Sequence, residues 1–208
     1  MNLRAPGLYT DRSVQSHAHD LHNWTVLVRH GATVVDAARP ASTWVLSDAG
    51  RDSVAALARR LRQLDRVLIV CSPEPKARQT AELIRPHGEI CLDDDLREHG
   101  VGQVPFLSAD DFDRAVIAFF EQPQVVAFGS ESAAAAAQRM ERAVARLHGA
   151  SAIVVSHGRI ISAYVSTLLG SNGLSIWRAL KMPDVLLVNP VTREVRPLSD
   201  YDSAQISD

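Results

Sequence analysis

Two histidines in this sequence each stand between the end of an apolar run and a glycine. The first lies in Arg29-His30-Gly31, directly after the β-branched run 24–29, and the second in His157-Gly158, after the run 152–156. A lone His-Gly pair is typical of a turn, but ligands of open α/β sheets bind outside the carboxyl ends of strands. We therefore expect the two imidazoles to face each other across one pocket, beside an anion-binding arginine.

Two further blocks carry charged side chains that suit phosphoryl chemistry. Lys76 and Arg78 follow the strand-like run 67–71, and Glu98 follows a shorter run, 89–92. Phosphoryl transfer to a histidine needs an unprotonated ring nitrogen, cations for the equatorial oxygens and an acid for the leaving alkoxide. The four blocks together contain all three kinds of group.

In this order, the blocks resemble the motifs of the histidine phosphatase superfamily, which has the phosphoglycerate mutase-like fold. The resemblance runs from about Trp24 to Leu198 and implies a metal-independent phosphomonoesterase of the histidine acid phosphatase type, with no cofactor and a small phosphorylated substrate. His30 is then the nucleophile that becomes a phosphohistidine, with its other ring N–H held by a backbone carbonyl. Glu98, which matches the family's Leu-x-Glu pattern, is the expected general acid. The expected phosphate-binding residues are Arg29, Gly31, Thr33, Lys76, His157 and Gly158, with helix-start N–H groups near Pro75 and Gly158 adding to the anion site.

The chain departs from the family pattern at three places. Where relatives have Arg-Ala-x-x-Thr-Ala, this chain has Lys76 as the aligned cation, while Arg78 lies two residues further on. Side chains two residues apart on a helix point about 200° apart, so we expect Lys76 to contact phosphate and keep Arg78 as the alternative. Asp36 replaces a common asparagine and disfavours a very acidic substrate. The segment 101–105 replaces a Trp-Glu-Gly element, which leaves the substrate contacts open.

Several functions fit these motifs. A phosphatase is favoured over a phosphoglycerate mutase-like phosphotransferase, because mutase-type relatives have longer insertions around the acid. A non-catalytic phospholigand-binding protein and a protein phosphohistidine phosphatase remain alternatives. Gly129-Ser130-Glu131-Ser132 resembles the family's Gly-Glu-Ser segment and is interpreted mainly as helix capping.

Composition is that of an ordinary soluble globular protein. The chain has 208 residues, 46% hydrophobic, with a net charge of −2, which gives no reason to expect a nucleic-acid or membrane partner. Cys71 and Cys91 lie in apolar runs and are expected to be buried free thiols in a reducing compartment, hence a cytoplasmic location. We expect a loosely ordered extension over 1–23, one histidine phosphatase domain over 24–198 and a tail over 199–208; a homodimer is left open. His17, His19 and His22 are interpreted as part of a solvated extension.

Strand-like and helical patterns alternate along the chain. Strands are expected at 24–29, 67–71, 152–156 and in a hairpin formed by 185–188 and 194–197. This order predicts a three-layer α/β/α sandwich with a mostly parallel sheet and an antiparallel edge strand. The expected helices begin near Ser47, Pro75, Ser108, Ser132 and Arg159.

Overall fold

The computed structural model describes residues 24–64, 68–100, 106–147 and 150–198. The expected extension over 1–23, with its histidines, and the tail over 199–208 lie outside these residues, as does the segment 101–105. Among the described residues, no helix is long and apolar enough to cross a membrane.

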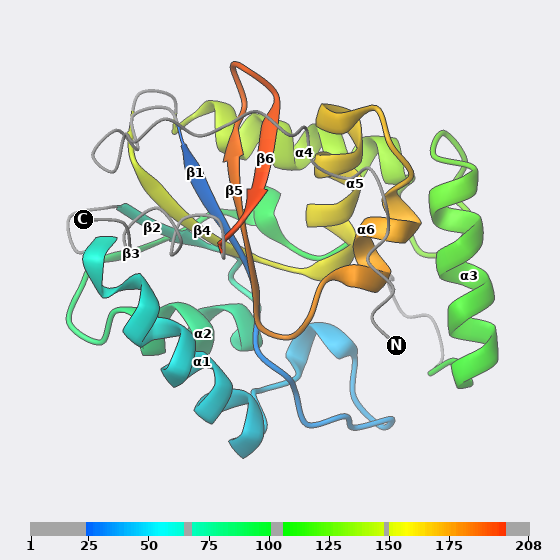
Figure 1. The fold of residues 1–208 in the computed structure, drawn as a ribbon. Helices are drawn as coiled ribbons and strands as arrows, with labels where there is room; N and C mark the ends of the chain where they lie inside the picture. Colours follow the sequence, from blue (N-terminus) through cyan, green and yellow to red (C-terminus); the bar gives the residue numbers. More distant parts are fainter. Residues whose placement is uncertain (1–23, 65–67, 101–105, 148–149, 199–208) are drawn as a thin grey trace, which may run out of the picture.

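In the described part of the chain, six strands form one mixed central sheet (Figure 1). The strands are β1 (Thr25–Arg29), β2 (Leu68–Cys71), β3 (Ile90–Leu92), β4 (Ala152–Ser156), β5 (Asp184–Asn189) and β6 (Glu194–Pro197). Their order across the sheet is β3-β2-β4-β1-β5-β6, in which β3, β2, β4 and β1 are parallel and β5 is antiparallel to both of its neighbours. The expected α/β fold is confirmed. In detail, the antiparallel strand is second from the edge, because the hairpin joins the sheet through its first strand.

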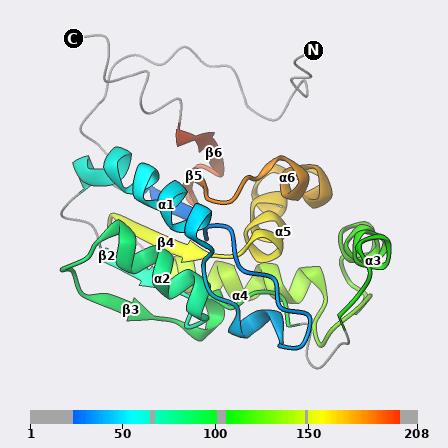
Figure 2. The same ribbon diagram turned by 90° about the horizontal axis from the view of Figure 1, so that it is seen from below.

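Helices cover both faces of the sheet (Figure 2). The described helices are α1 (Asp48–Arg60), α2 (Pro75–Ile84), α3 (Ala109–Glu121), α4 (Ala133–Ala145), α5 (Gly158–Leu169) and α6 (Gly173–Ala179). Successive strand residues point to opposite faces, so Val26 and Val28 pack in the core with α1 and α2, whereas Leu27 packs with α4 and α5. This burial on both faces explains why the central strands carry consecutive apolar residues.

The helix starts follow local capping rules. Ser47, Ser108 and Ser132 each accept a hydrogen bond from the backbone N–H three residues later, and α2 begins at Pro75. No helix was expected at the seven residues of α6. So short an element shows less than two turns of periodicity, and its Asn172 cap is equally typical of a turn.

Candidate active site

The two histidines meet because β1 and β4 are parallel neighbours in register. Arg29 pairs with Ser156, so the next residue of each strand, His30 and His157, leaves the sheet at the same edge. The backbone N–H of His30 donates to the carbonyl of Ser156 at 3.0 Å, and the ring centroids lie 5.1 Å apart at an interplanar angle of 62°. The expected convergence of two imidazoles from distant parts of the chain is present.

His30 is held as a neutral imidazole with one nitrogen unbound. Its Nδ1 lies 2.7 Å from the carbonyl oxygen of Gly31, which as an acceptor fixes the proton on Nδ1 and leaves Nε2 unprotonated. Burial lowers the pKa of His30 to about 4, and the charges of Lys76 and Arg29 act in the same direction. At neutral pH this ring is therefore uncharged.

Gly31 allows the close approach that holds this ring. A Cβ at Gly31 would lie 2.7 Å from Cγ2 of Val54 and 3.0 Å from the carbonyl oxygen of Gly50, at the start of α1. Its N–H donates to Oγ1 of Thr80 at 3.2 Å. The turn after β1 is thus fixed by α1 on one side and α2 on the other.

His157 is fully buried and presents one ring nitrogen without a partner. Nε2 lies 2.8 Å from Oγ of Ser72, and that oxygen already accepts from the N–H of Glu74 at 3.2 Å. The hydroxyl can donate to Nε2 or accept from it; when it donates, the proton of His157 lies on Nδ1, an atom with no hydrogen-bond partner among the described residues. Burial and nearby cations hold the pKa of His157 well below its usual value.

Arg29 lies with its guanidinium against the start of α5. Nη1 donates to the carbonyl of Leu180 at 2.6 Å, and burial lowers the pKa of the group. A Cβ at Gly158 would lie 2.9 Å from both Cζ and Nε of Arg29. The glycine after His157 thus leaves the space that the arginine occupies.

The two candidate cations of α2 point in opposite directions. Lys76 is 5% exposed, and its Nζ donates to the carbonyl of Ala41 at 2.7 Å and to Oε2 of Glu74 at 2.6 Å. The Arg78 side chain is 52% exposed and pairs with Glu82 across one helical turn. The structure brings Lys76 to the histidines and leaves Arg78 on the outer face.

Glu74 is a buried carboxylate that sequence reasoning missed. Besides pairing with Lys76, it accepts from the N–H of Glu98 at 2.9 Å through Oε1, which lies 3.6 Å from Nε2 of His157. Its place before the helix-starting Pro75 is typical of a cap, yet its side chain makes no capping hydrogen bond to α2. Its partners come from distant segments, which local sequence does not indicate.

Glu98 sits at the N-terminus of α5. Oε1 accepts from the N–H groups of His99 at 2.9 Å and Ile160 at 3.2 Å, and Oε2 accepts from the N–H of Arg159 at 3.3 Å. Burial raises the pKa of Glu98, but the charge of Arg159 and these N–H donors outweigh it and lower the pKa to about 2. Glu98 is therefore ionised, and it takes first-turn N–H groups of α5 that were expected to add to the anion site.

An ion pair holds the segment that carries Glu98. Nη2 of Arg139 donates to Oε1 of Glu131 at 2.6 Å, while Nη1 donates to the carbonyls of Asp95 at 2.7 Å and Arg97 at 2.9 Å. Glu131 also accepts from the N–H of Gly100 at 3.1 Å. The interpretation of the 129–132 segment as helix capping covers only part of its role. Ser132 does cap α4, but Glu131 accepts a hydrogen bond from Gly100 and so holds the loop that carries Glu98.

The recorded contacts of Thr33 and Asp36, in the loop after His30, are with residues of the same or a neighbouring loop segment. Thr33 is half-buried and pairs with Leu46 in an isolated bridge. The Oδ1 of Asp36 accepts from the N–H of Ala38 at 2.9 Å, within its own turn. Of the two cysteines, Cys71 is buried as expected, whereas Cys91 is half-buried; both are free thiols.

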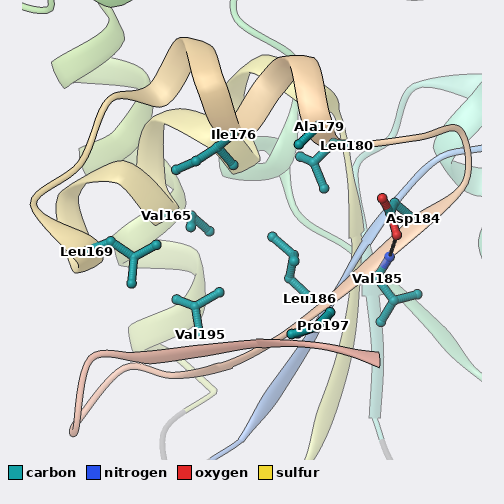
Figure 3. Close-up of a pocket in the computed structure, with 10 residues that line it drawn as sticks. All are labelled: Val165, Leu169, Ile176, Ala179, Leu180, Asp184, Val185, Leu186, Val195 and Pro197. Carbon is teal, nitrogen blue, oxygen red and sulfur yellow. Dashed lines mark hydrogen bonds between the residues drawn. The ribbon is translucent and has the colours of Figure 1, made fainter. Parts of the chain in front are cut away.

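A pocket elsewhere in the fold has the wrong chemistry for phosphate. It encloses about 90 Å³ between α5, α6 and the β5–β6 hairpin (Figure 3). Aliphatic side chains dominate its lining, and its acidic member, Asp184, uses Oδ1 to accept from the N–H of Val185 at 2.9 Å. An anion is not stabilised there, so the candidate site remains the edge where β1 and β4 end.

Comparison with known proteins gives a family and a fold. The model of the histidine phosphatase superfamily (branch 1) matches residues 25–193. Over 160 residues, covering 69% of this chain and 74% of the relative, the sequence is 30% identical to the protein named probable phosphoglycerate mutase GpmB of Erwinia tasmaniensis.

Solved structures of similar fold include a mycobacterial glucosyl-3-phosphoglycerate phosphatase in complex with inorganic phosphate. It is 26% identical, with a TM-score of 0.64 over 83% of this chain and 93% of that one. A mutant form of the phosphoserine phosphatase of Entamoeba histolytica, in complex with phosphoserine, shares the fold at 17% identity and a TM-score of 0.67, over 84% of this chain and 94% of that one. With the family model matching most of its length and the paired histidines at one sheet edge, the chain belongs to the histidine phosphatase superfamily.

Proposed function

We propose that the protein is a metal-independent phosphatase that hydrolyses a small phosphomonoester through a phosphohistidine on His30. The observation that carries the proposal is the pair of buried imidazoles, 5.1 Å apart, in which Nδ1 of His30 is hydrogen bonded and Nε2 is unprotonated. A neutral imidazole with one open nitrogen is a nucleophile, and a pKa of about 4 keeps His30 in this form at neutral pH.

In the first half-reaction, Nε2 of His30 attacks phosphorus and the ester P–O bond breaks, its electron pair going to the leaving alkoxide. Arg29, Lys76 and the Nδ1–H of His157 stabilise the charge on the equatorial oxygens. Glu98 gives a proton to the alkoxide. In the second half-reaction, Glu98 takes a proton from water as the water oxygen attacks phosphorus, and the P–N bond breaks with its electron pair returning to Nε2, which restores neutral His30. The proton on Glu98 then leaves with the released phosphate, so that Glu98 is ionised again.

The proton that Glu98 donates has to arrive with the substrate. Glu98 is ionised in the free site, with a pKa of about 2. The second pKa of a phosphomonoester is about 6, so at mildly acidic pH the substrate is a monoanion that still carries one proton. We infer that this proton passes to Glu98 on binding, as the negative phosphate raises the pKa of the carboxyl group.

The similarity to known proteins supports a phosphatase, and it also supports a mutase as a second candidate function. A mycobacterial phosphatase of this fold is 26% identical, whereas the relative at 30% identity is named a probable mutase. Both activities fit a phosphohistidine and differ in the acceptor, which is water in a phosphatase and a second hydroxyl group in a mutase. Turnover that depends on a bisphosphate primer would favour the mutase.

The proposal is tested with phosphate release from a series of phosphomonoesters with good and poor leaving groups. His30→Ala is expected to abolish turnover. Glu98→Gln is expected to slow alkyl phosphates more than aryl phosphates, because a poor leaving group depends more on protonation. Equal losses across the series would contradict the acid role of Glu98, and full activity of the His30 variant would contradict the nucleophile.

A further inference from the structure

Arg159 carries a buried guanidinium with few partners. The side chain is 9% exposed, and its Nε has no hydrogen-bond partner among the described residues. Its nearest recorded carboxylate oxygen, Oε2 of Glu98, lies 3.7 Å from Nη2, which is beyond a hydrogen bond. Arg139 differs, because its guanidinium donates to Glu131 and to backbone carbonyls.

Aromatic rings hold the Arg159 side chain in place. Its Cζ lies 5.5 Å from the ring centroid of Phe112 on α3 and 5.7 Å from that of Phe128, before α4. The faces of these rings attract a cation, but they accept none of its N–H groups in strong hydrogen bonds. The buried Nε–H of Arg159 has no acceptor among the described residues, which is costly for a charged group, and a bound anion would satisfy it.

The position of Arg159 relates it to one part of the substrate. Glu98 gives its proton to the ester oxygen, so the alcohol portion of the substrate lies beside this carboxylate. A hydrogen bond of about 2.8 Å added to the 3.7 Å between Arg159 and Glu98 puts the guanidinium within roughly 6.5 Å of the ester oxygen. A carboxylate one or two carbons from that oxygen spans this distance with bidentate contacts.

We propose that Arg159 is a specificity residue that binds a carboxylate on the alcohol portion of the substrate. The inference rests on the proposed function, because it takes the position of the ester oxygen from the role of Glu98. It restricts the substrate class to phosphorylated hydroxy acids.

The test uses two compounds that differ in one group. D-3-phosphoglycerate and glycerol 3-phosphate are compared as competitive inhibitors of p-nitrophenyl phosphate hydrolysis; the second compound has a hydroxymethyl group in place of the carboxylate. The inhibition constant of the acid is expected to be roughly 10- to 100-fold lower, as for a charge-assisted bidentate contact. Arg159→Met should remove this difference by raising the inhibition constant of D-3-phosphoglycerate alone, and Arg159→Lys should keep part of the difference. Arg114→Met, at an exposed arginine of α3, is the matched control and should change neither constant.

Three outcomes would overturn the inference. One is equal inhibition by the two compounds in the wild-type protein. Another is an equal rise in the inhibition constants of both compounds in Arg159→Met, which would mean that the residue acts on the phosphate site through Glu98. If the methionine variant does not fold, a lysine variant that keeps the full wild-type preference would equally exclude recognition by the arginine fork. Absence of p-nitrophenyl phosphate hydrolysis would contradict the proposed function instead, and calorimetric binding of the same two compounds would then decide the carboxylate contact separately.

Discussion

Adding one methyl group at Gly158 should damage catalysis while sparing the fold. An ideal Cβ there lies 2.9 Å from Cζ and Nε of Arg29 and 3.1 Å from Nη2, whereas ordinary contacts begin at 3.4 Å. The guanidinium is the end of a flexible side chain, so it can retreat and relieve the clash. In doing so it strains the 2.6 Å hydrogen bond from Nη1 to the carbonyl of Leu180 and moves away from the phosphate position.

The expected loss of kcat/KM follows from the displacement of the Arg29 guanidinium. A displacement approaching about 1 Å at a group that stabilises transferred charge costs about 100-fold in rate, so kcat/KM of Gly158→Ala should fall by about two orders of magnitude. The free energy of unfolding should change by no more than about 1 kcal/mol, because the weakened Leu180 contact is offset by the better helix propensity of alanine.

The assay pairs steady-state hydrolysis of p-nitrophenyl phosphate with thermal unfolding, and Gly170→Ala is the control. Gly170 ends the same helix at φ +60°, with nothing within 4 Å of an added Cβ. Its variant should lose about 1 kcal/mol of stability from the strained backbone and keep its kcat/KM. A Gly158→Ala protein with wild-type kcat/KM would refute the placement of Arg29 at the transferring phosphoryl group.

Three other predictions concern the charges of the site. Lys76→Ala should lower kcat/KM by at least about 10-fold, whereas Arg78→Ala, on the outer face of α2, should leave it within about twofold; the opposite order would show that α2 is wrongly oriented. NMR of 15N-labelled histidine should find the Nδ1–H tautomer of His30 with no titration above about pH 5, and a pKa near the ordinary value of about 6.5 would contradict its burial. The kcat/KM profile should be bell-shaped: activity is lost below about pH 4 as His30 gains a proton, and above about pH 6 as the substrate loses the proton that Glu98 relays. A profile that stays flat well above about pH 6 would exclude proton delivery by a monoanionic substrate.

The sequence was sufficient for the features that depend on local pattern. Apolar runs ended by His-Gly located β1 and β4, and their parallel pairing alone brings His30 and His157 together. The separation of Lys76 and Arg78 by about 200° on a helix likewise predicted that only one of them faces inward, and the resemblance to the family pattern selected Lys76.

The features that escaped prediction depend on contacts between distant segments. Glu74 is next to a helix start, and only the fold places it between Lys76, Glu98 and His157. The same holds for Arg159, whose neighbours Phe112 and Phe128 come from α3 and the loop before α4. The direction of the pKa shift of Glu98 was also open, because burial and cations oppose each other and the backbone N–H groups at the α5 start help to set the balance.

The central claim is tested most directly by trapping the covalent intermediate. Protein mixed with a phosphomonoester, quenched within milliseconds in alkali and digested for mass spectrometry should carry an acid-labile phosphoryl group on Nε2 of His30, absent from His30→Ala and increased in a variant slowed at the second half-reaction. A protein that turns over substrate with a burst of product but with His30 unmodified, or with the phosphoryl group on another residue, would contradict the account.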